Sequence, residues 1–223
     1  MRKTVLLLAA LAIALLLVSG VAWAVTKDCR AGADFCVGTN ERDTLNGSEE
    51  RDKIYGKAAT DKLFGNGGND NLLGGEDNDT IRGGAGEDNV SGHTQDGDEI
   101  YGQAGADYLE DDSWRCGNRC VDDDNLLDGG SGPDWLYGDN KPYGGLGDDD
   151  LDGAYTFGGK RLIRGGPGED RITSAGKAVD TIYVQDGARD TVACGPEEDT
   201  VYFDKGVDSV NPVTCENRVS EPQ

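Results

Sequence analysis

The chain is poor in the residues that build an ordinary globular core. Its 223 residues include one Met, one His and four Phe, and only 36% of them are hydrophobic. An average soluble domain has roughly 45–50% apolar residues, so the composition argues against one large conventional core. The abundance of Asp and Gly, which are weak helix formers, argues against a helical bundle.

Positive charge is scarce as well. Lys and Arg total 21 against 43 Asp and Glu, which gives a formal net charge of -22. A chain this acidic is repelled by nucleic acid and by anionic membrane surfaces. High net charge with low hydrophobicity ordinarily predicts disorder, and only the order of the residues argues otherwise.

The first 24 residues have the three parts of a secretory signal peptide. A basic start at Arg2 and Lys3 precedes the apolar run Val5–Val18 and the small-x-small site Ala22-Trp23-Ala24. We expect cleavage after Ala24 and a secreted, extracellular protein without a membrane span. The alternative is an uncleaved anchor, because the uncharged stretch from Val5 is long enough to cross a bilayer.

The six cysteines all lie beyond the expected cleavage site. An even number of cysteines in an exported chain suggests disulfides, and six allow fifteen pairings. Zinc is the weaker alternative, because there is no Cys-x-x-Cys pair and His93 is the single histidine. We expect the local pairing Cys29–Cys36, Cys116–Cys120 and Cys194–Cys215.

A period close to nine residues organises nearly the whole chain beyond the leader. Sixteen Asp residues are each followed two positions later by Ile, Leu or Val, several times more often than composition predicts. One further unit, Arg161-Leu162-Ile163, keeps the aliphatic residue and has no acid. The sixteen are Asp43, Asp52, Asp61, Asp70, Asp79, Asp88, Asp98, Asp107, Asp124, Asp134, Asp149, Asp170, Asp180, Asp190, Asp199 and Asp208.

Glycines mark the other half of each unit. Four stretches fit Gly-Gly-x-Gly-x-Asp-x-U-x, where U is a large aliphatic residue: 83–91, 129–137, 144–152 and 165–173. These units resemble the RTX, or hemolysin-type, calcium-binding nonapeptide repeat over about residues 37–211. The resemblance implies an all-β fold, a parallel β-roll solenoid with two nonapeptides per coil. In each unit the Gly/Asp part forms a turn and x-U-x forms a short strand.

The physical chemistry of the unit agrees with this resemblance. In a three-residue strand the middle side chain points to the opposite face from its neighbours, so U faces inward. Repeat n then lies beside repeat n+2, at about 4.8 Å, and the Asp carboxylates stack along one edge. Stacked carboxylates repel, and Ca²⁺, which takes six to eight oxygen ligands, reverses that repulsion. Glycine permits positive φ and lets backbone carbonyls reach the ion.

We therefore predict several bound Ca²⁺ ions and a chain that stays largely unfolded without them. The best pairs are expected to be Asp70/Asp88 and Asp149/Asp170. The side-chain candidates are Asp52, Asp61, Asp70, Asp79, Asp88, Asp98, Asp107, Asp134, Asp149 and Asp170. The backbone candidates are Gly65, Gly67, Gly68, Gly74, Gly75, Gly83, Gly84, Gly86, Gly129, Gly130, Gly132, Gly144, Gly145, Gly147, Gly165, Gly166 and Gly168.

The repeats also predict the domain organisation. Arg161 is expected to place a fixed positive charge where an ion would otherwise bind. The later units keep the strand and lose most glycines, so they should form a metal-poor cap. The expected segments are the signal peptide (1–24), an N-terminal segment (25–36), the calcium-binding β-roll (37–173) with an insertion (111–123), the cap (174–215) and a tail (216–223).

The sequence contains no complete catalytic motif. The Asp148-x-Asp150-x-Asp152-Gly153 stretch imitates an EF-hand loop, but its twelfth position is Gly159 rather than Glu. We expect a non-catalytic, exported calcium-binding protein with a structural or surface-interaction role and no nucleic-acid partner. The alternative is a small secreted hydrolase or a carbohydrate-binding protein built on the roll, with exposed aromatic rings that stack on sugars.

Overall fold

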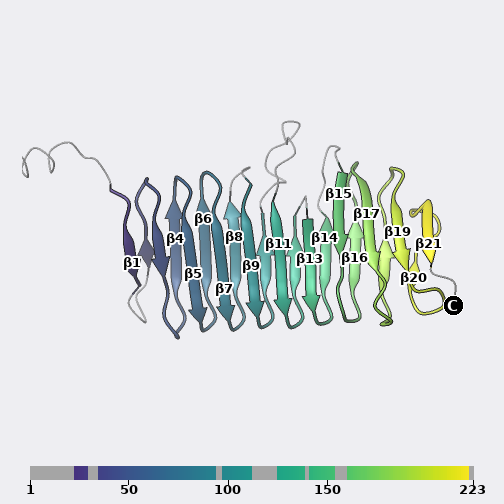
Figure 1. Ribbon diagram of the computed structural model, residues 1–223, viewed down its shortest axis with the longest axis horizontal. Coiled ribbons are helices and arrows are strands. Elements are labelled where there is room, and N and C mark those ends of the chain that lie inside the picture. The colour runs from purple at the N-terminus through teal and green to yellow at the C-terminus, as the bar shows by residue number, and fades with distance from the viewer. Residues whose placement is uncertain are drawn as a thin grey trace, which may run out of the picture.

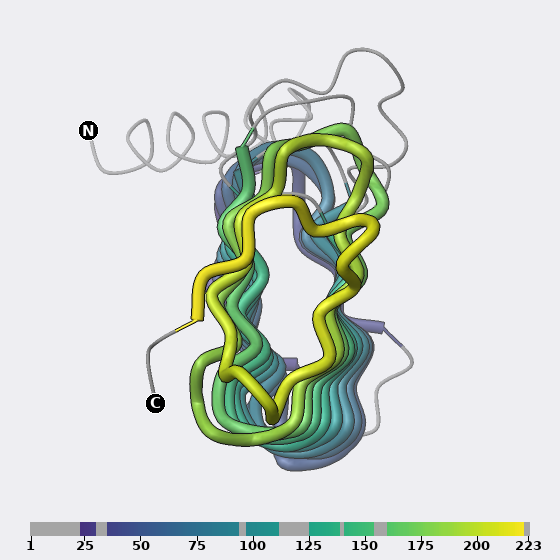
Figure 2. Tube along the Cα trace, turned by 90° about the vertical axis from the view of Figure 1, so that its right-hand side faces the viewer, coloured from purple at the N-terminus to yellow at the C-terminus, as the bar shows by residue number. Residues whose placement is uncertain are grey.

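A computed structural model describes residues 23–29, 35–93, 97–111, 125–138, 141–153 and 160–220. Within these ranges the chain forms only strands and turns, and every strand pair is parallel. The strands alternate between two sheets, so each coil of the chain adds one strand to each (Figure 1). The view along the axis shows the coils stacked as one flattened tube (Figure 2). The predicted all-β, parallel β-roll is thereby confirmed.

The odd-numbered strands form an eleven-stranded sheet, here called sheet A, and the even-numbered strands form a ten-stranded sheet, sheet B. Sheet A contains β1 (Thr26–Asp28), β3 (Thr44–Asn46), β5 (Lys62–Gly67), β7 (Thr80–Ala85), β9 (Glu99–Ala104), β11 (Leu126–Ser131), β13 (Lys141–Leu146), β15 (Lys160–Arg164), β17 (Val179–Val184), β19 (Thr200–Phe203) and β21 (Asn217–Ser220). Sheet B contains β2 (Cys36–Val37), β4 (Lys53–Lys57), β6 (Asn71–Gly75), β8 (Asn89–His93), β10 (Tyr108–Glu110), β12 (Trp135–Tyr137), β14 (Asp150–Gly153), β16 (Arg171–Ser174), β18 (Thr191–Ala193) and β20 (Ser209–Val210).

A single file of aliphatic side chains from each sheet fills the interior. Leu63, Ile81 and Ile100 of sheet A are fully buried and lie in register on adjacent strands. Leu72 and Val90 of sheet B are buried in the same way. The core is thus two aliphatic residues per coil, and the rest of the interior is lined by the Gly and Asp residues of the turns.

The structure corrects the predicted register after the insertion. The sequence suggested Asp124 as the acid and Leu126 as the inward residue of one unit. Instead Leu127 is buried, and Asn125 takes the acid position with no exposed surface. A further strand, β13, was missed because Pro142 occupies its inward position, where it aligns with Leu127.

Disulfides close both ends of the described roll. Cys29 is bonded to Cys36, and Cys194 to Cys215, as predicted from their spacing. The third predicted pair, Cys116–Cys120, lies outside the described residues, as do most of the predicted signal peptide and the insertion. In the ranges that the structure describes, no helix is long and apolar enough to cross a membrane.

Candidate metal centres in the turns

The acid positions form two rows, one along each edge of the roll. The A edge comprises the turns that lead into sheet A strands, and the B edge those that lead into sheet B strands. The A-edge residues are Asp43, Asp61, Asp79, Asp98, Asn125, Arg161, Asp180, Asp199 and Glu216. The B-edge residues are Asp52, Asp70, Asp88, Asp107, Asp134, Asp149, Asp170, Asp190 and Asp208.

One oxygen of each stacked carboxylate binds the backbone of the preceding coil. The Asp107 N–H donates to Oδ1 of Asp134 at 2.8 Å, and the Asp134 N–H donates to Oδ1 of Asp149 at 2.8 Å. The same contact recurs along both edges, from 2.6 Å between Val25 and Asp43 to 3.2 Å between Asp199 and Glu216. These bonds fix the carboxylates inside the turns, in register.

The other oxygen is left without a protein partner in the central coils. Buried Oδ2 atoms with no hydrogen-bond donor occur in Asp61, Asp70, Asp88, Asp107, Asp134, Asp149, Asp170 and Asp190. Each of these residues has at most 3% of its surface exposed. A buried carboxylate oxygen without a partner is costly, so eight of them in stacked turns indicate that a positive group belongs there.

Glycine at the first position of the repeat shapes the space in front of Oδ2. A Cβ atom on Gly56 would lie 2.5 Å from Oδ2 of Asp61 and 2.5 Å from the carbonyl oxygen of Gly74 in the next coil. The same pair of oxygens faces the first glycine of other turns, for example Gly102. Each such turn therefore brings a carboxylate and a backbone carbonyl from adjacent coils to one small space.

The backbone conformation at the second position separates two kinds of turn. In the turns of Asp134, Asp149 and Asp170 this position is Gly130, Gly145 and Gly166, with φ of 102°, 110° and 106°. Lys57, Asn66 and Gln103 adopt positive φ at the same position before Asp61, Asp70 and Asp107. Non-glycine residues rarely adopt positive φ, and where they do the strain often serves a site.

The terminal turns have no positive φ at the second position, and there the N–H satisfies the carboxylate. The Ser48 N–H donates to Oδ2 of Asp52 at 2.6 Å, and the Asp204 N–H to Oδ2 of Asp208 at 2.6 Å. Thr39 and Gly195 serve Asp43 and Asp199 in the same way. In these four turns Oδ2 thus already has a donor from the chain, and Asp52, a predicted ligand, is one of the four carboxylates.

Burial shifts the acidity of the central carboxyl groups. Desolvation raises the pKa of Asp107, Asp134 and Asp170 from 3.8 to about 7, against the lowering effect of the backbone hydrogen bonds. Repulsion from neighbouring carboxylates raises these pKa values further; Asp107 and Asp149 both act on Asp134. The charged form is thus disfavoured unless a cation is close.

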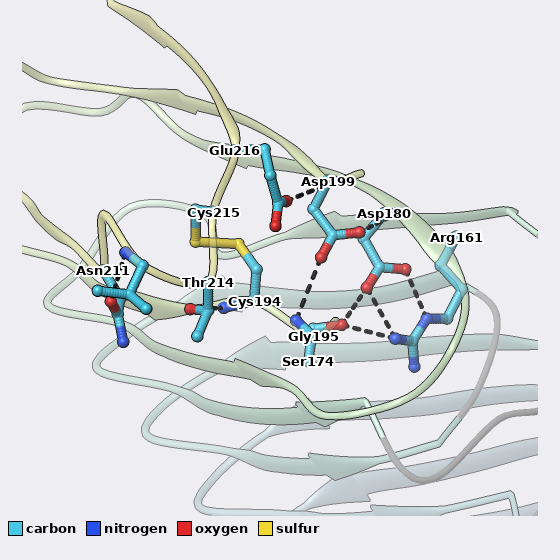
Figure 3. Close-up of a disulfide and its surroundings, with 11 residues drawn as sticks. Arg161, Ser174, Asp180, Cys194, Gly195, Asp199, Asn211, Thr214, Cys215 and Glu216 are labelled. Atoms are coloured by element: carbon cyan, nitrogen blue, oxygen red, sulfur yellow. Dashed lines mark hydrogen bonds and ion pairs between the residues drawn. A yellow bond between two sulfur atoms is a disulfide. The ribbon is translucent and has the colours of Figure 1, made fainter. Parts of the chain in front are cut away.

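On the A edge a guanidinium takes the place of an acid. Arg161 is 4% exposed and aligns with Asp180 of the next coil. Its Nε donates to Oδ1 of Asp180 at 2.7 Å and its Nη2 to Oδ2 at 2.8 Å and to Oγ of Ser174 at 2.6 Å (Figure 3). Ser174 also donates to Asp180. The chain thus provides its own cation in this turn.

The structure brings nearly all predicted metal residues into the turns, and it adds Asp190. Asp79 and Asp98 accept the same inter-coil hydrogen bonds as the others. Asp190 was assigned to a metal-poor cap because its turn, which begins at Gln185, has one glycine, but its Oδ2 is buried without a donor. Asp190 could not be identified as a candidate from the sequence, because what distinguishes it is the direction of the nearby N–H groups and not a sequence motif.

The donors suit a hard cation such as Ca²⁺. In the described part of the chain, no three Asp, Glu, His or Cys side chains converge as a metal-binding group. An ion in these turns would therefore take most of its ligands from carbonyl oxygens, with carboxylates supplying the charge. Ca²⁺ accepts such oxygen sets, whereas softer metals select nitrogen and sulfur. The residues present therefore fit calcium.

The fold and these turns define a parallel β-roll repeat protein with carboxylate-lined edges. The sequence model of the RTX calcium-binding nonapeptide repeat matches the chain in four copies, at residues 37–72, 64–97, 94–110 and 121–140. No curated protein matches the chain. The predicted resemblance to the RTX calcium-binding repeat family is confirmed over residues 37–140. The coils continue beyond residue 140 with the same inter-coil bonds.

Proposed function

We propose that this chain is an exported calcium-binding repeat protein that folds on calcium and acts without catalysis. The observation that carries the proposal is the row of buried Oδ2 atoms without donors in the central turns. Folding without a counter-charge would bury these carboxylates next to one another, whereas bound Ca²⁺ turns the repulsion into attraction. Binding free energy is then folding free energy.

The Oδ2 atoms of the central Asp residues and the first-position glycine carbonyls would hold the ions. On the A edge Asp61 is in this position, with Gly56 and Gly74. On the B edge the set runs from Asp70 to Asp190. The glycines at the second and fourth positions of the repeat, for example Gly84 and Gly86 with φ of 121° and 133°, give the turn the curvature that exposes its carbonyls.

Calcium titration of the metal-free protein tests the proposal. We expect circular dichroism to gain β-structure as Ca²⁺ is added and calorimetry to count several ions per chain. Mg²⁺ at the same concentration should restore little structure, because it demands a rigid octahedral site and keeps its waters. Full β-structure in a chelator would contradict the proposal, and so would a calcium stoichiometry of zero.

Export rests on the predicted signal peptide and agrees with the two disulfides, which persist in oxidising compartments. Expression of the full chain, followed by mass spectrometry of the medium, tests it. We expect the released protein to begin at Val25. An intact N-terminus on a membrane-bound product would instead support the anchor.

One observation favours the alternative of carbohydrate binding. Trp135 is 52% exposed, makes an edge-on contact with Tyr108 and borders a shallow hollow with Asp148 and Asp150. An exposed indole beside carboxylates can stack on a sugar and accept its hydroxyls. Screening a glycan array with the wild type and Trp135→Ala distinguishes the readings; binding that the variant loses would favour the alternative.

A further inference from the structure

The outer face of sheet A carries a column of side chains in strict register. This column, here called the outer column, follows the position after each inward aliphatic residue. In chain order it contains Asn46, Phe64, Arg82, Tyr101, Asp128, Tyr143, Arg164, Tyr183 and Tyr202. Six strands in a row, from β9 to β19, thus present Tyr, Asp, Tyr, Arg, Tyr and Tyr to the surface.

Rings and guanidinium groups of the column stack on one another. The Arg82 guanidinium lies 5.7 Å from the centre of the Phe64 ring and 5.0 Å from that of Tyr101. Arg164 lies 5.7 Å from the Tyr183 ring, which stacks on Tyr202 at 4.6 Å and 3°. Cross-strand contacts of this kind stabilise a sheet, and they use the ring faces.

Between Phe64 and Tyr202, Asp128 is the one short side chain of the outer column. It stands between Tyr101 and Tyr143, and its carboxylate borders a hollow lined by Arg82, Tyr101, Gln103 and Gly130. Among the described residues no hydrogen bond or ion pair engages this carboxylate. In register the Asp128 carboxylate therefore stands between two tyrosines, and the hollow beside it lies on the side of Tyr101.

The size of the gap matches a guanidinium. Side chains two strands apart are separated by about 10 Å, twice the spacing between strands. The ring-to-guanidinium distance within the same column is 5.0 Å, so one planar cation fits between Tyr101 and Tyr143. Such a cation would restore the alternation of rings and cations that Arg82 and Arg164 establish on either side.

We propose that the gap at Asp128 is a docking site for an arginine side chain of a basic partner peptide. The two carboxylate oxygens can accept hydrogen bonds from one edge of a guanidinium, as those of Asp180 do from Nε and Nη2 of Arg161 within this chain. The tyrosine rings accept its planar faces, which the compact ammonium of lysine lacks. The net charge of -22 attracts basic segments to the molecule over long distances.

Titration of calcium-saturated protein with two capped peptides tests the site. The peptides Gly-Ser-Arg-Ser-Gly and Gly-Ser-Lys-Ser-Gly differ only in the cation, and calorimetry and tyrosine NMR shifts report binding. We expect the arginine peptide to bind at least about fivefold more tightly and to shift the Tyr101 and Tyr143 resonances. Equal binding of both peptides, or binding of neither, would overturn the proposal.

Two variants locate the binding. Asp128→Asn should weaken the arginine peptide by about tenfold, as expected for loss of a charge-assisted pair. The matched control is Asp152→Asn, an outward carboxylate on sheet B at the equivalent position of β14, which should bind as the wild type does. A similar loss in both variants would mean general charge attraction. Unchanged circular dichroism and calcium stoichiometry show that either variant is folded, independently of the peptide result.

Discussion

The two edges of the roll differ in how the charge of their buried carboxylates is balanced. On the B edge every one of the nine positions is Asp, and the seven from Asp70 to Asp190 all have an Oδ2 without a donor. On the A edge the row of acids is interrupted by Asn125 and by Arg161, which neutralises Asp180. One edge thus leaves its carboxylates without a counter-charge from the chain, whereas the other carries an amide and a guanidinium of its own.

Breaking the B edge at its centre should have a large effect that depends on calcium. Asp134→Asn keeps an Oδ1 acceptor for the Asp107 N–H but removes the charge that an ion needs. With calcium at about 100 times its dissociation constant, loss of one site should cost about 3 kcal/mol of stability. In a chelator the variant should instead keep more structure than the wild type, because Asp107 and Asp149 no longer face a third buried carboxylate. Thermal unfolding with calcium and circular dichroism in chelator measure the two effects.

The control for this variant is Asp150→Asn, which changes an exposed carboxylate on the neighbouring strand β14. It should change stability by less than about 0.5 kcal/mol in either condition. If Asp134→Asn lowered stability equally with calcium and with chelator, the carboxylate would have a structural role only.

On the A edge the decisive group is Arg161. Arg161→Gln leaves Asp180 buried without a cation and should destabilise the protein by about 3–5 kcal/mol at every calcium concentration that keeps it folded. Arg171→Gln is the control, because its side chain is 70% exposed and its pair with Asp150 at 3.8 Å contributes little. Chemical denaturation reports both values. If the loss of stability in Arg161→Gln depended on the calcium concentration, this A-edge turn would not be independent of the ion.

Replacing Arg161 by the acid of the repeat tests whether its guanidinium occupies the position of an ion. Arg161→Asp should add a calcium site, which calorimetry detects as one more ion per chain, and should make the cap calcium-dependent. An unchanged number of bound calcium ions would contradict the interpretation that the Arg161 guanidinium takes the place of an ion.

The B edge also predicts opposite pH responses for the two forms of the protein. Metal-free, the folded chain holds protons on Asp107, Asp134 and Asp170, with pKa values of about 7, that the unfolded chain releases near 3.8. This stability is fully present below pH 4 and is lost as pH rises through 7. Circular dichroism in chelator should show more β-structure at pH 5 than at pH 8, where the metal-free chain is largely unfolded. With calcium the trend should reverse, because protons compete with the ion below about pH 7.

The smallest expected change is restoration of an acid to the A edge. Asn125→Asp places a carboxylate next to Asp98, whose N–H already donates to this position at 2.7 Å. We expect at most one additional calcium ion and a small loss of stability in chelator. Asn71→Asp, which adds the same charge on the outer face of β6, should leave the stoichiometry unchanged.

The sequence predicted the architecture because the period of nine carries it. Inward aliphatic residues such as Ile81, and the acid two positions earlier, specify both the strand and the turn. The prediction was wrong where an insertion shifted the phase, since Asp124 and Leu126 imitate the pattern that Asn125 and Leu127 fill. Spacing alone cannot choose between two frames one residue apart; burial decides.

The state of each carboxylate could not be predicted from composition. Asp52 and Asp70 have the same place in the repeat, yet one accepts the Ser48 N–H and the other has no donor for Oδ2. The difference lies in φ at the second position, where Asn66 is positive. Glycine predicts such a turn, but Asn66, Lys57 and Gln103 adopt it because the stacked coils impose it.

The hydrogen bond between each Asp and the coil before it keeps the same geometry in coils of different length. Asp107 and Asp134 are 27 residues apart and Asp134 and Asp149 only 15, yet both bonds measure 2.8 Å. Residues added between strands leave the register untouched, so this chain can gain or exchange loops without redesign of its interior. For protein engineering, the connection between β10 and β11, where this bond spans 27 residues, is accordingly a natural point at which to graft a foreign peptide onto the stacked coils.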